Sequence, residues 1–189
     1  MSNALAEVAT EAATCTLCAL AEGRTQVVFG MGHAEADLMF VGEGPGANED
    51  EQGLPFVGRS GQLLDRLLGE EMGLTRDQCY ITNVVKCRPP GNRDPKPDEI
   101  AACRPYLERQ ISLIGPRVLV TLGNFAAKLL LETTTGITKL RGQSYPYGGE
   151  GGGLVLVPTS HPAAALRGGG TVLAQMRADL VRAKLALVS

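Results

Sequence analysis

The amino-acid sequence predicts an α/β protein, a single α/β/α sandwich with a central, mostly parallel, four-stranded sheet. Four short apolar segments carry this prediction: 37–41, 80–85, 117–122 and 154–157 are rich in β-branched residues, as strands buried on both faces are. Helical patterns separate these segments, and such alternation is typical of a parallel sheet lying between two helix layers. The length of 189 residues suits one domain spanning 1–189.

The helical patterns follow the strands in order. The first, 60–69, places four leucines on one face, and the second, 97–114, begins with a proline that favours a helix start. Its internal Pro105 is expected to kink this helix or split it in two. Two further helices are predicted at 124–131 and 172–187, and the glycine-rich segment 148–153 is expected to form a hairpin-like turn.

Bulk composition narrows the possible functions. The net charge of −2 argues against a protein that coats nucleic acid through overall charge, although a local basic patch remains possible. No apolar run approaches the roughly 20 residues that a membrane span needs, and the N-terminus lacks the pattern of a secretory signal. We therefore expect a cytoplasmic protein without membrane attachment, and a monomer.

Unusual segments follow each predicted strand, where ligands bind in open α/β sheets. "GEGPG" follows the first strand and "KCRPPGN" the second, whose last turn contains Asn83. "GNFAA" and "PTSHPAAALRGGG" follow the third and fourth strands. The sequence therefore predicts a functional site at this edge of the sheet.

Four of the five cysteines form two pairs, C-x2-C at Cys15 and Cys18 and C-x15-C at Cys87 and Cys103. Disulfides are rare in the cytosol, so metal ligation is the better interpretation. Zinc and an iron–sulfur cluster both remain open, but the wide second spacing suits a larger cluster whose ligands converge from separate segments. Scattered core thiols are the alternative, and Cys79 is expected to be a small buried hydrophobic residue.

Taken together, "GEGPG" with "GLPFVG", "ITNVVKCRPPGNR", "SHPAAALR" and the four cysteines in this order resemble family 4, the iron–sulfur branch of the uracil-DNA glycosylase superfamily. The resemblance spans nearly the whole chain. It implies an enzyme that flips uracil out of single- or double-stranded DNA and hydrolyses its N-glycosidic bond, leaving an abasic site. It also implies a [4Fe–4S] cluster held by the four paired cysteines.

Individual residues suit that chemistry. Phe56 can stack on a flipped base, and Asn83 can accept from uracil N3–H and donate to O4, a pattern that cytosine inverts. The backbone amides of Gly42 to Gly44 can approach the base edge because no side chain intervenes. His161, after the fourth strand, can donate to uracil O2 as negative charge develops there. His33 has no such context and is expected at the surface or in a loop.

The attacking water needs a carboxylate that orients it or takes its proton. Glu43 is the first candidate and Glu49 the second, while Asp50 and Glu51 are expected to be solvated. In the better-known branch of the superfamily an Asp stands where this sequence has Gly44, so the identity of the catalytic carboxylate is open.

DNA contacts are expected from the segment after His161. By resemblance, Leu166 is a wedge that fills the space left by the flipped base, and Arg167 contacts phosphate or the orphan base. Arg59 and Arg88, with Arg93 and Lys96, lie in loops on the same sheet edge and could form a local basic strip. The alternative for these residues is an ordinary solvated surface.

Three other functions compete with the glycosylase. A module that binds uracil-DNA through an iron–sulfur domain without turnover would show binding but no base release. A covalent uracil-DNA binder of the superfamily would carry a Lys-Arg-Arg-Ile-His insertion, which is absent from this sequence. A small-molecule nucleotide hydrolase would have no use for a wedge. Lyase activity needs an amine nucleophile, and strand alternation places Lys86 on the face opposite Asn83, which favours a monofunctional enzyme.

Overall fold

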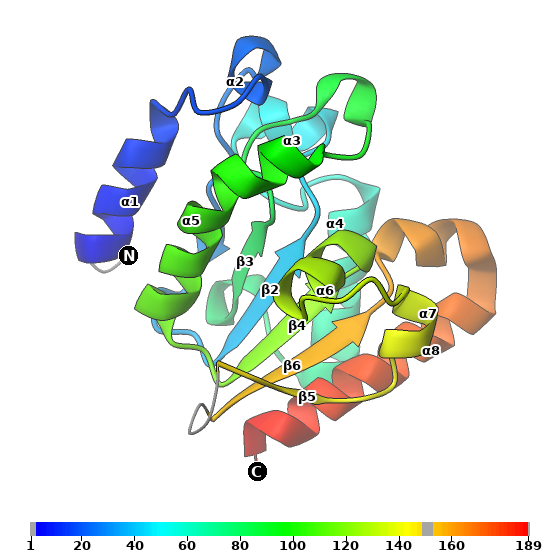
Figure 1. The fold of residues 1–189 in the computed structure, drawn as a ribbon. Helices are drawn as coiled ribbons and strands as arrows, with labels where there is room; N and C mark the ends of the chain where they lie inside the picture. The colour runs from blue at the N-terminus through cyan, green and yellow to red at the C-terminus, as the bar shows by residue number, and fades with distance from the viewer. Residues whose placement is uncertain (1–2, 149–152, 189) are drawn as a thin grey trace.

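A computed structural model describes residues 3–148 and 153–188, which form a six-stranded sheet in the order β1-β3-β2-β4-β6-β5 (Figure 1). The four central strands are parallel and correspond to the four predicted ones: β2 (Leu38–Gly42), β3 (Tyr80–Asn83), β4 (Val118–Leu122) and β6 (Leu154–Thr159). The prediction of an α/β sandwich with a mostly parallel sheet is therefore confirmed.

The predicted number of strands was wrong, because two short antiparallel strands extend the edges of the sheet. These are β1 (Met31–Gly32), which pairs with β3, and β5 (Tyr145–Tyr147), which pairs with β6. With only two and three residues, and with Gly or Pro among them, neither has an apolar pattern that a sequence search could detect.

Helices cover both faces of the sheet (Figure 1). One face lies under α1 (Asn3–Ala13), α5 (Pro97–Ile114) and α6 (Asn124–Leu130), and the other under α4 (Arg59–Leu67), the π-helical turn η1 (Leu68–Met72) and α8 (Pro162–Val188). The remaining short elements are α2 (Leu20–Gly23), α3 (Ala47–Gln52), η2 (Arg76–Gln78), η3 (Pro90–Asn92) and α7 (Ile137–Leu140).

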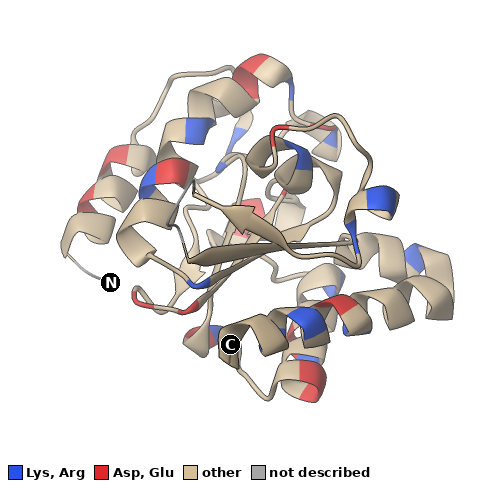
Figure 2. Ribbon diagram, turned by 60° about the horizontal axis from the view of Figure 1, so that its bottom comes forward, with Lys and Arg blue, Asp and Glu red and all other residues tan. Residues whose placement is uncertain are grey.

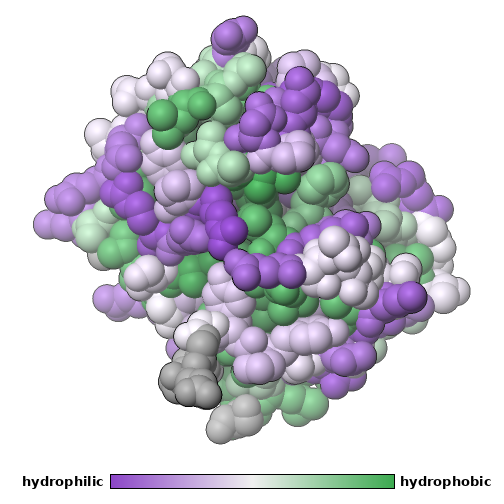
Figure 3. Space-filling model, in the orientation of Figure 1, coloured by the Kyte–Doolittle hydropathy of each residue, from purple (hydrophilic) through white to green (hydrophobic). Residues whose placement is uncertain are grey.

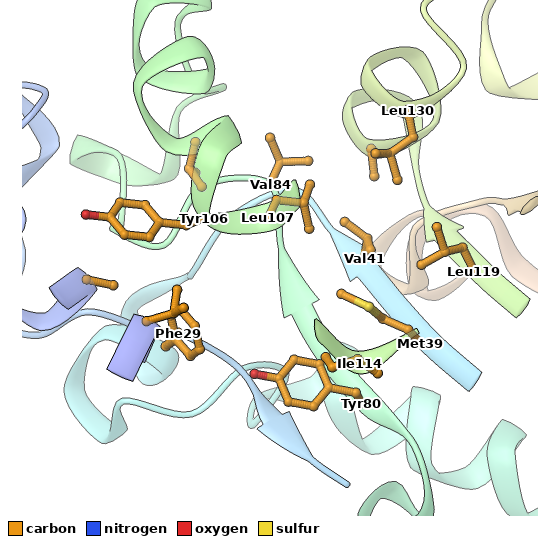
Figure 4. Close-up of a cluster of buried hydrophobic side chains, with 14 of the residues drawn as sticks. Phe29, Met39, Val41, Tyr80, Val84, Tyr106, Leu107, Ile114, Leu119 and Leu130 are labelled. Carbon is orange, nitrogen blue, oxygen red and sulfur yellow. The ribbon is translucent and has the colours of Figure 1, made fainter. Parts of the chain in front are cut away.

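Alternation along β2 divides the core into two halves. Met39 and Val41 face α5 and α6, whereas Leu38 and Phe40 face α4 and α8. Figure 4 shows the first half, in which Leu107 and Tyr106 of α5 pack over the sheet residues. Because β2 and β4 are buried along their whole length, as the burial of Phe40 and Val120 illustrates, both strands read as continuous apolar runs.

Two helices bear on the predictions made for Pro105 and for residues 172–187. Helix α5 continues across Pro105, so the chain is not split there. The predicted helix at 172–187 is confirmed as the second of two helical segments in α8 (Pro162–Val188), which meet at the non-helical Gly169, where φ is 69°. The segment from Pro162 to this kink was not predicted as a helix. The glycines at 168–170 hid this first segment from pattern analysis. The predicted turn at 148–153 lies largely outside the described residues, at 149–152.

Charges of both signs are interspersed over the helices (Figure 2), in line with the net charge of −2. On the face seen in Figure 3, apolar residues in the centre are ringed by hydrophilic ones. Across the described residues we find no helix with both the length and the apolar character of a membrane span.

Candidate functional site

A cavity of about 460 Å³ opens beyond the carboxyl ends of the parallel strands, the place predicted from the sequence. Its walls come from the loop after β2, the loop before α4, the end of β3 with its following turn, and the start of α8. Eight residues named in the sequence analysis line it together: Glu43, Gly44, Glu49, Phe56, Asn83, Arg93, His161 and Arg167. The volume lies within the range of small-molecule pockets.

Asn83 ends β3 and turns its amide into this cavity. The residue is 2% exposed, and among the described residues its Oδ1 meets no hydrogen-bond donor. A buried amide oxygen without a partner is costly in a folded protein unless a ligand supplies the donor. The Oδ1 of Asn83 therefore lies where a ligand in the cavity could supply the missing donor.

Gly42 does not line the cavity but makes room for it. A Cβ at this position would lie 2.5 Å from both Asn83 Oδ1 and Phe56 Cζ. Any larger residue would push these two side chains apart, so glycine is required here for packing. Gly44 is similarly crowded, since its Cβ would meet Val85 Cγ2 at 2.7 Å.

Phe56 and His161 form one wall of the cavity. Their ring centroids lie 5.7 Å apart, with an angle of 29° between the planes. Phe56 is buried and adopts a left-handed backbone with φ of 54°, which is uncommon for a bulky residue. The backbone that carries the Phe56 ring is therefore held in an unusual local conformation.

His161 is set up as a neutral hydrogen-bond donor. Its Nδ1 accepts the backbone N–H of Ala163 at 3.1 Å, which leaves the proton of a neutral ring on Nε2. Burial, and secondarily the positive charge of Arg167, lowers the pKa of His161 to about 4. The imidazole is thus uncharged near neutral pH. His33, by contrast, is exposed, as predicted.

The two candidate carboxylates differ in their surroundings. Burial, followed by the negative charge of Asp94, raises the pKa of Glu43 to about 7. Glu49 instead accepts three backbone N–H groups: Gly46 at 3.1 Å, Val57 at 3.0 Å and Gly58 at 3.2 Å. Glu49 therefore ties the loop after β2 to the loop that carries Phe56.

The expectation that Asp50 is solvated was wrong. Asp50 is 3% exposed, and both carboxylate oxygens accept the backbone N–H of Thr25, at 2.9 and 3.1 Å. The contact joins segments 25 residues apart, so no local pattern indicates it. Glu51 is exposed, as expected.

The predicted DNA-contacting residues lie around the cavity or line it. Leu166, in the first turns of α8, is 42% exposed, and Arg59 is exposed at the start of α4. Arg88 donates from Nε to Asn92 Oδ1 at 2.6 Å. Arg93 lines the cavity but is bound by both oxygens of Glu99, at 2.6 and 2.9 Å.

Six further residues line the cavity but were not singled out from the sequence: Pro45, Gly46, Ser60, Pro89, Asn92 and Ala163. Asn92 has a left-handed backbone with φ of 56° in the turn η3. The "PPGN" string signals such a turn, but only the fold shows that the turn reaches the cavity.

A second, apolar cavity is lined by four cysteines: Cys15, Cys18, Cys87 and Cys103. Two of their sulfurs accept hydrogen bonds: Lys86 N donates to Cys103 at 3.3 Å, and Arg24 Nη1 donates to Cys87 at 3.5 Å. Within 3–148 and 153–188, no three Cys, His, Asp or Glu side chains are placed to hold a metal ion. Cys79 is fully buried elsewhere, as predicted.

Lys86 lies between the two cavities but lines only the one with the cysteines. The residue is 1% exposed, and its Nζ donates to Thr82 Oγ1 and the Asn83 carbonyl at 2.7 Å each, and to Gln110 Oε1 at 2.5 Å. Burial lowers the pKa of Lys86 to about 7. The amine thus points away from the first cavity, as strand alternation predicted.

The fold is thus an α/β sandwich whose strand ends carry an amide oxygen without a donor among the described residues, an aromatic ring and a neutral imidazole, an arrangement suited to a flat, polar ring. Comparison with known families narrows the class of protein. The chain belongs to the uracil-DNA glycosylase superfamily, whose family model matches residues 29–183.

Curated relatives agree with this assignment. A type-4 uracil-DNA glycosylase of Sulfurisphaera tokodaii is 49% identical over 87% of this chain and 76% of its own length. The type-4 enzyme of Saccharolobus solfataricus is 47% identical over 84% of this chain and 76% of its own length. That of Archaeoglobus fulgidus is 44% identical, covering 87% of this chain and 84% of its own.

Proposed function

We propose that this protein is a uracil-DNA glycosylase of the type-4 kind, which excises uracil from DNA by hydrolysis and leaves an abasic site for repair. The similarity to type-4 enzymes supports the activity. The single observation that carries the substrate is the buried Oδ1 of Asn83, which finds no donor within the described residues and faces the cavity.

Asn83 would select uracil by its hydrogen-bonding pattern. The amide oxygen accepts from N3–H, and the amide nitrogen donates to O4. Cytosine presents an acceptor at N3 and a donor at C4, so it would leave the buried amide unsatisfied. Such a mismatch is a strong basis for discrimination in a dry pocket.

The base would lie against Phe56, with His161 near its O2. Breaking the N-glycosidic bond leaves an oxocarbenium-like sugar and a uracil anion, and a neutral imidazole donating from Nε2 stabilises that anion. A protonated histidine would offer charge as well, but the low pKa of His161 keeps it uncharged.

Glu43 is the better candidate for the carboxylate that orients the attacking water. With a pKa of about 7, a substantial fraction of Glu43 is ionised at neutral pH. The ionised carboxylate is still basic enough to take a proton from the attacking water. Glu49 already accepts three backbone N–H groups, so its role would be to hold the loop. The ionised Glu43 would also stabilise the positive charge that develops on the sugar.

Leu166 and the surrounding arginines would contact DNA. An exposed leucine beside the cavity suits a wedge that replaces the flipped nucleotide. Arg167 lines the cavity and Arg59 is exposed next to it, which favours phosphate contacts. Arg88 could also contact phosphate if its hydrogen bond to Asn92 is broken when DNA binds.

The four cysteines would hold a [4Fe–4S] cluster. They line one apolar cavity, and backbone and guanidinium donors reach two of the sulfurs, as at thiolate-ligated clusters. Four thiolates can also hold zinc, but the wide spacing of Cys87 and Cys103 favours the larger cluster, whose ligands converge from separate segments. When bound, the cluster would supply bonds that fix the segment between Cys87 and Cys103, while excision uses the residues of the first cavity.

One assay tests the activity and separates it from binding without turnover. The protein is incubated with single- and double-stranded oligonucleotides that carry one deoxyuridine, then treated with alkali and analysed on a gel. We expect strand cleavage at that position only after alkali. Stable binding without cleavage would favour the non-catalytic module, and uracil release from free deoxyuridine would favour the small-molecule hydrolase.

A further inference from the structure

Phe56 needs support from outside the cavity because its backbone is in the left-handed region, with φ of 54°. An aromatic residue does not hold this conformation by itself, so the surroundings must stabilise it. Glycine would adopt the conformation freely but could not supply a ring. The stacking surface therefore depends on the groups that hold the peptide of Phe56.

Arg76, on η2, is the main such group. Its Nη2 donates to the carbonyl of Phe56 at 2.7 Å, and its Nη1 donates to the carbonyl of Pro55 at 3.3 Å. Its Nε donates to Asp65 Oδ1 on α4 at 2.8 Å. The planar guanidinium therefore spans two successive carbonyls and an anchored carboxylate, which a flexible ammonium could not do at once.

The same peptide also packs against α4. A Cβ at Gly61 would lie 1.7 Å from the carbonyl oxygen of Phe56, so the helix packs directly against that oxygen. The ring itself is confined by Gly42 and stacks on His161. Arg76 thus acts at one end of a chain of contacts that reaches the cavity, although it does not line the cavity itself.

We propose that Arg76 is a positioning residue that sets the ring of Phe56 against the flipped base, with Asp65 orienting the guanidinium. This inference rests on the proposed excision of uracil. Its alternative is a purely structural tie between η2 and α4. The two differ in one respect: a positioning role requires the ring of Phe56, whereas a structural tie does not.

The test is a double-mutant cycle measured by single-turnover excision from a deoxyuridine duplex. Arg76→Gln should lower the rate about 10-fold in the wild-type background, since displacement of a substrate-contacting group costs rate. In the Phe56→Ala background it should cause no further loss, because residues that act through one another are not additive. Arg76→Lys should recover part of the rate. Arg109→Gln, which removes an exposed arginine paired with Glu11 on α1, is the control.

Equal losses in both backgrounds, or an unchanged rate in Arg76→Gln, would overturn the positioning role. If Arg76→Gln does not fold, Asp65→Asn replaces it: a smaller loss, again confined to proteins that keep Phe56, supports the role, and a loss shared by both backgrounds refutes it. A wild-type protein that excises no uracil would instead overturn the proposed function, so the two failures are distinguishable.

Discussion

The ring of Phe56 stacks on the imidazole of His161 at 5.7 Å between centroids, joining the loop before α4 to the segment after β6. Asn83, from the end of β3, completes the same cavity. These three side chains come from distant parts of the sequence and meet because parallel strands place their carboxyl ends along one edge.

The first prediction concerns Asn83 and His161. Replacing either by Ala should lower uracil excision at least about 100-fold, since each removes a hydrogen bond that strengthens as the base departs. Single-turnover rates on a deoxyuridine duplex measure the effect. His33→Ala, at an exposed histidine, is the matched control and should be near normal. Near-normal rates for both cavity variants would refute the assignment of the site.

The second prediction concerns the pH dependence set by Glu43. Because its pKa is raised to about 7, the excision rate should rise as pH passes through 7 and Glu43 ionises. Glu43→Gln should be slow and should lose this rise, whereas Glu51→Gln, at an exposed carboxylate, should keep it. A pH profile of single-turnover rates tests this prediction. A Glu43→Gln profile that keeps the wild-type rise would exclude Glu43 as the base.

Glu43 also affects stability, which gives a third prediction. Its folded pKa of about 7 exceeds the ordinary 4.5, so the folded state binds the proton more tightly. Protonation of Glu43 therefore contributes to folding stability. This contribution is fully present below pH 4.5 and is lost as pH rises through 7. Glu43→Gln should therefore raise the melting temperature relative to wild type more at pH 8 than at pH 5. Equal shifts at both pH values would contradict the assigned pKa.

A fourth prediction concerns Leu166. If this exposed side chain fills the gap left by the flipped base, Leu166→Ala should slow excision from duplex DNA more than from single strands, where no stacked gap forms. Leu185→Ala, at a 62% exposed leucine near the other end of α8, is the matched control. Equal losses on both substrates would argue against a wedge.

The fifth prediction concerns the cysteine cavity. Purified protein should be brown, absorb near ~400 nm and contain iron, as thiolate-ligated clusters do. Cys103→Ser should reduce iron content and absorbance, whereas Cys79→Ala should keep both because Cys79 lies in the opposite half of the core. A colourless protein with one zinc would refute the cluster.

Strand-level predictions succeeded where the pattern was local. The four central strands were predictable because each is a short, mainly apolar segment rich in β-branched residues, and the cavity was placed correctly because strand ends define it. The edge strands β1 and β5 were missed because two or three residues carry no periodicity. The helical segment of α8 before Gly169 was missed because the glycines at 168–170 break the helical pattern.

Residue roles divide in the same way. The sequence by itself determined the class of fold and the order of its motifs. It also indicated Asn83, His161 and the four paired cysteines as site candidates, because residue type and position after a strand are local properties. Tertiary structure distinguished the two candidate carboxylates. Glu49 accepts three backbone N–H groups, whereas Glu43 lies in a site that raises its pKa. Arg76 and Asp50 acquire their roles only through contacts with distant segments, and hydrogen bonds of that kind exist only once the core has packed.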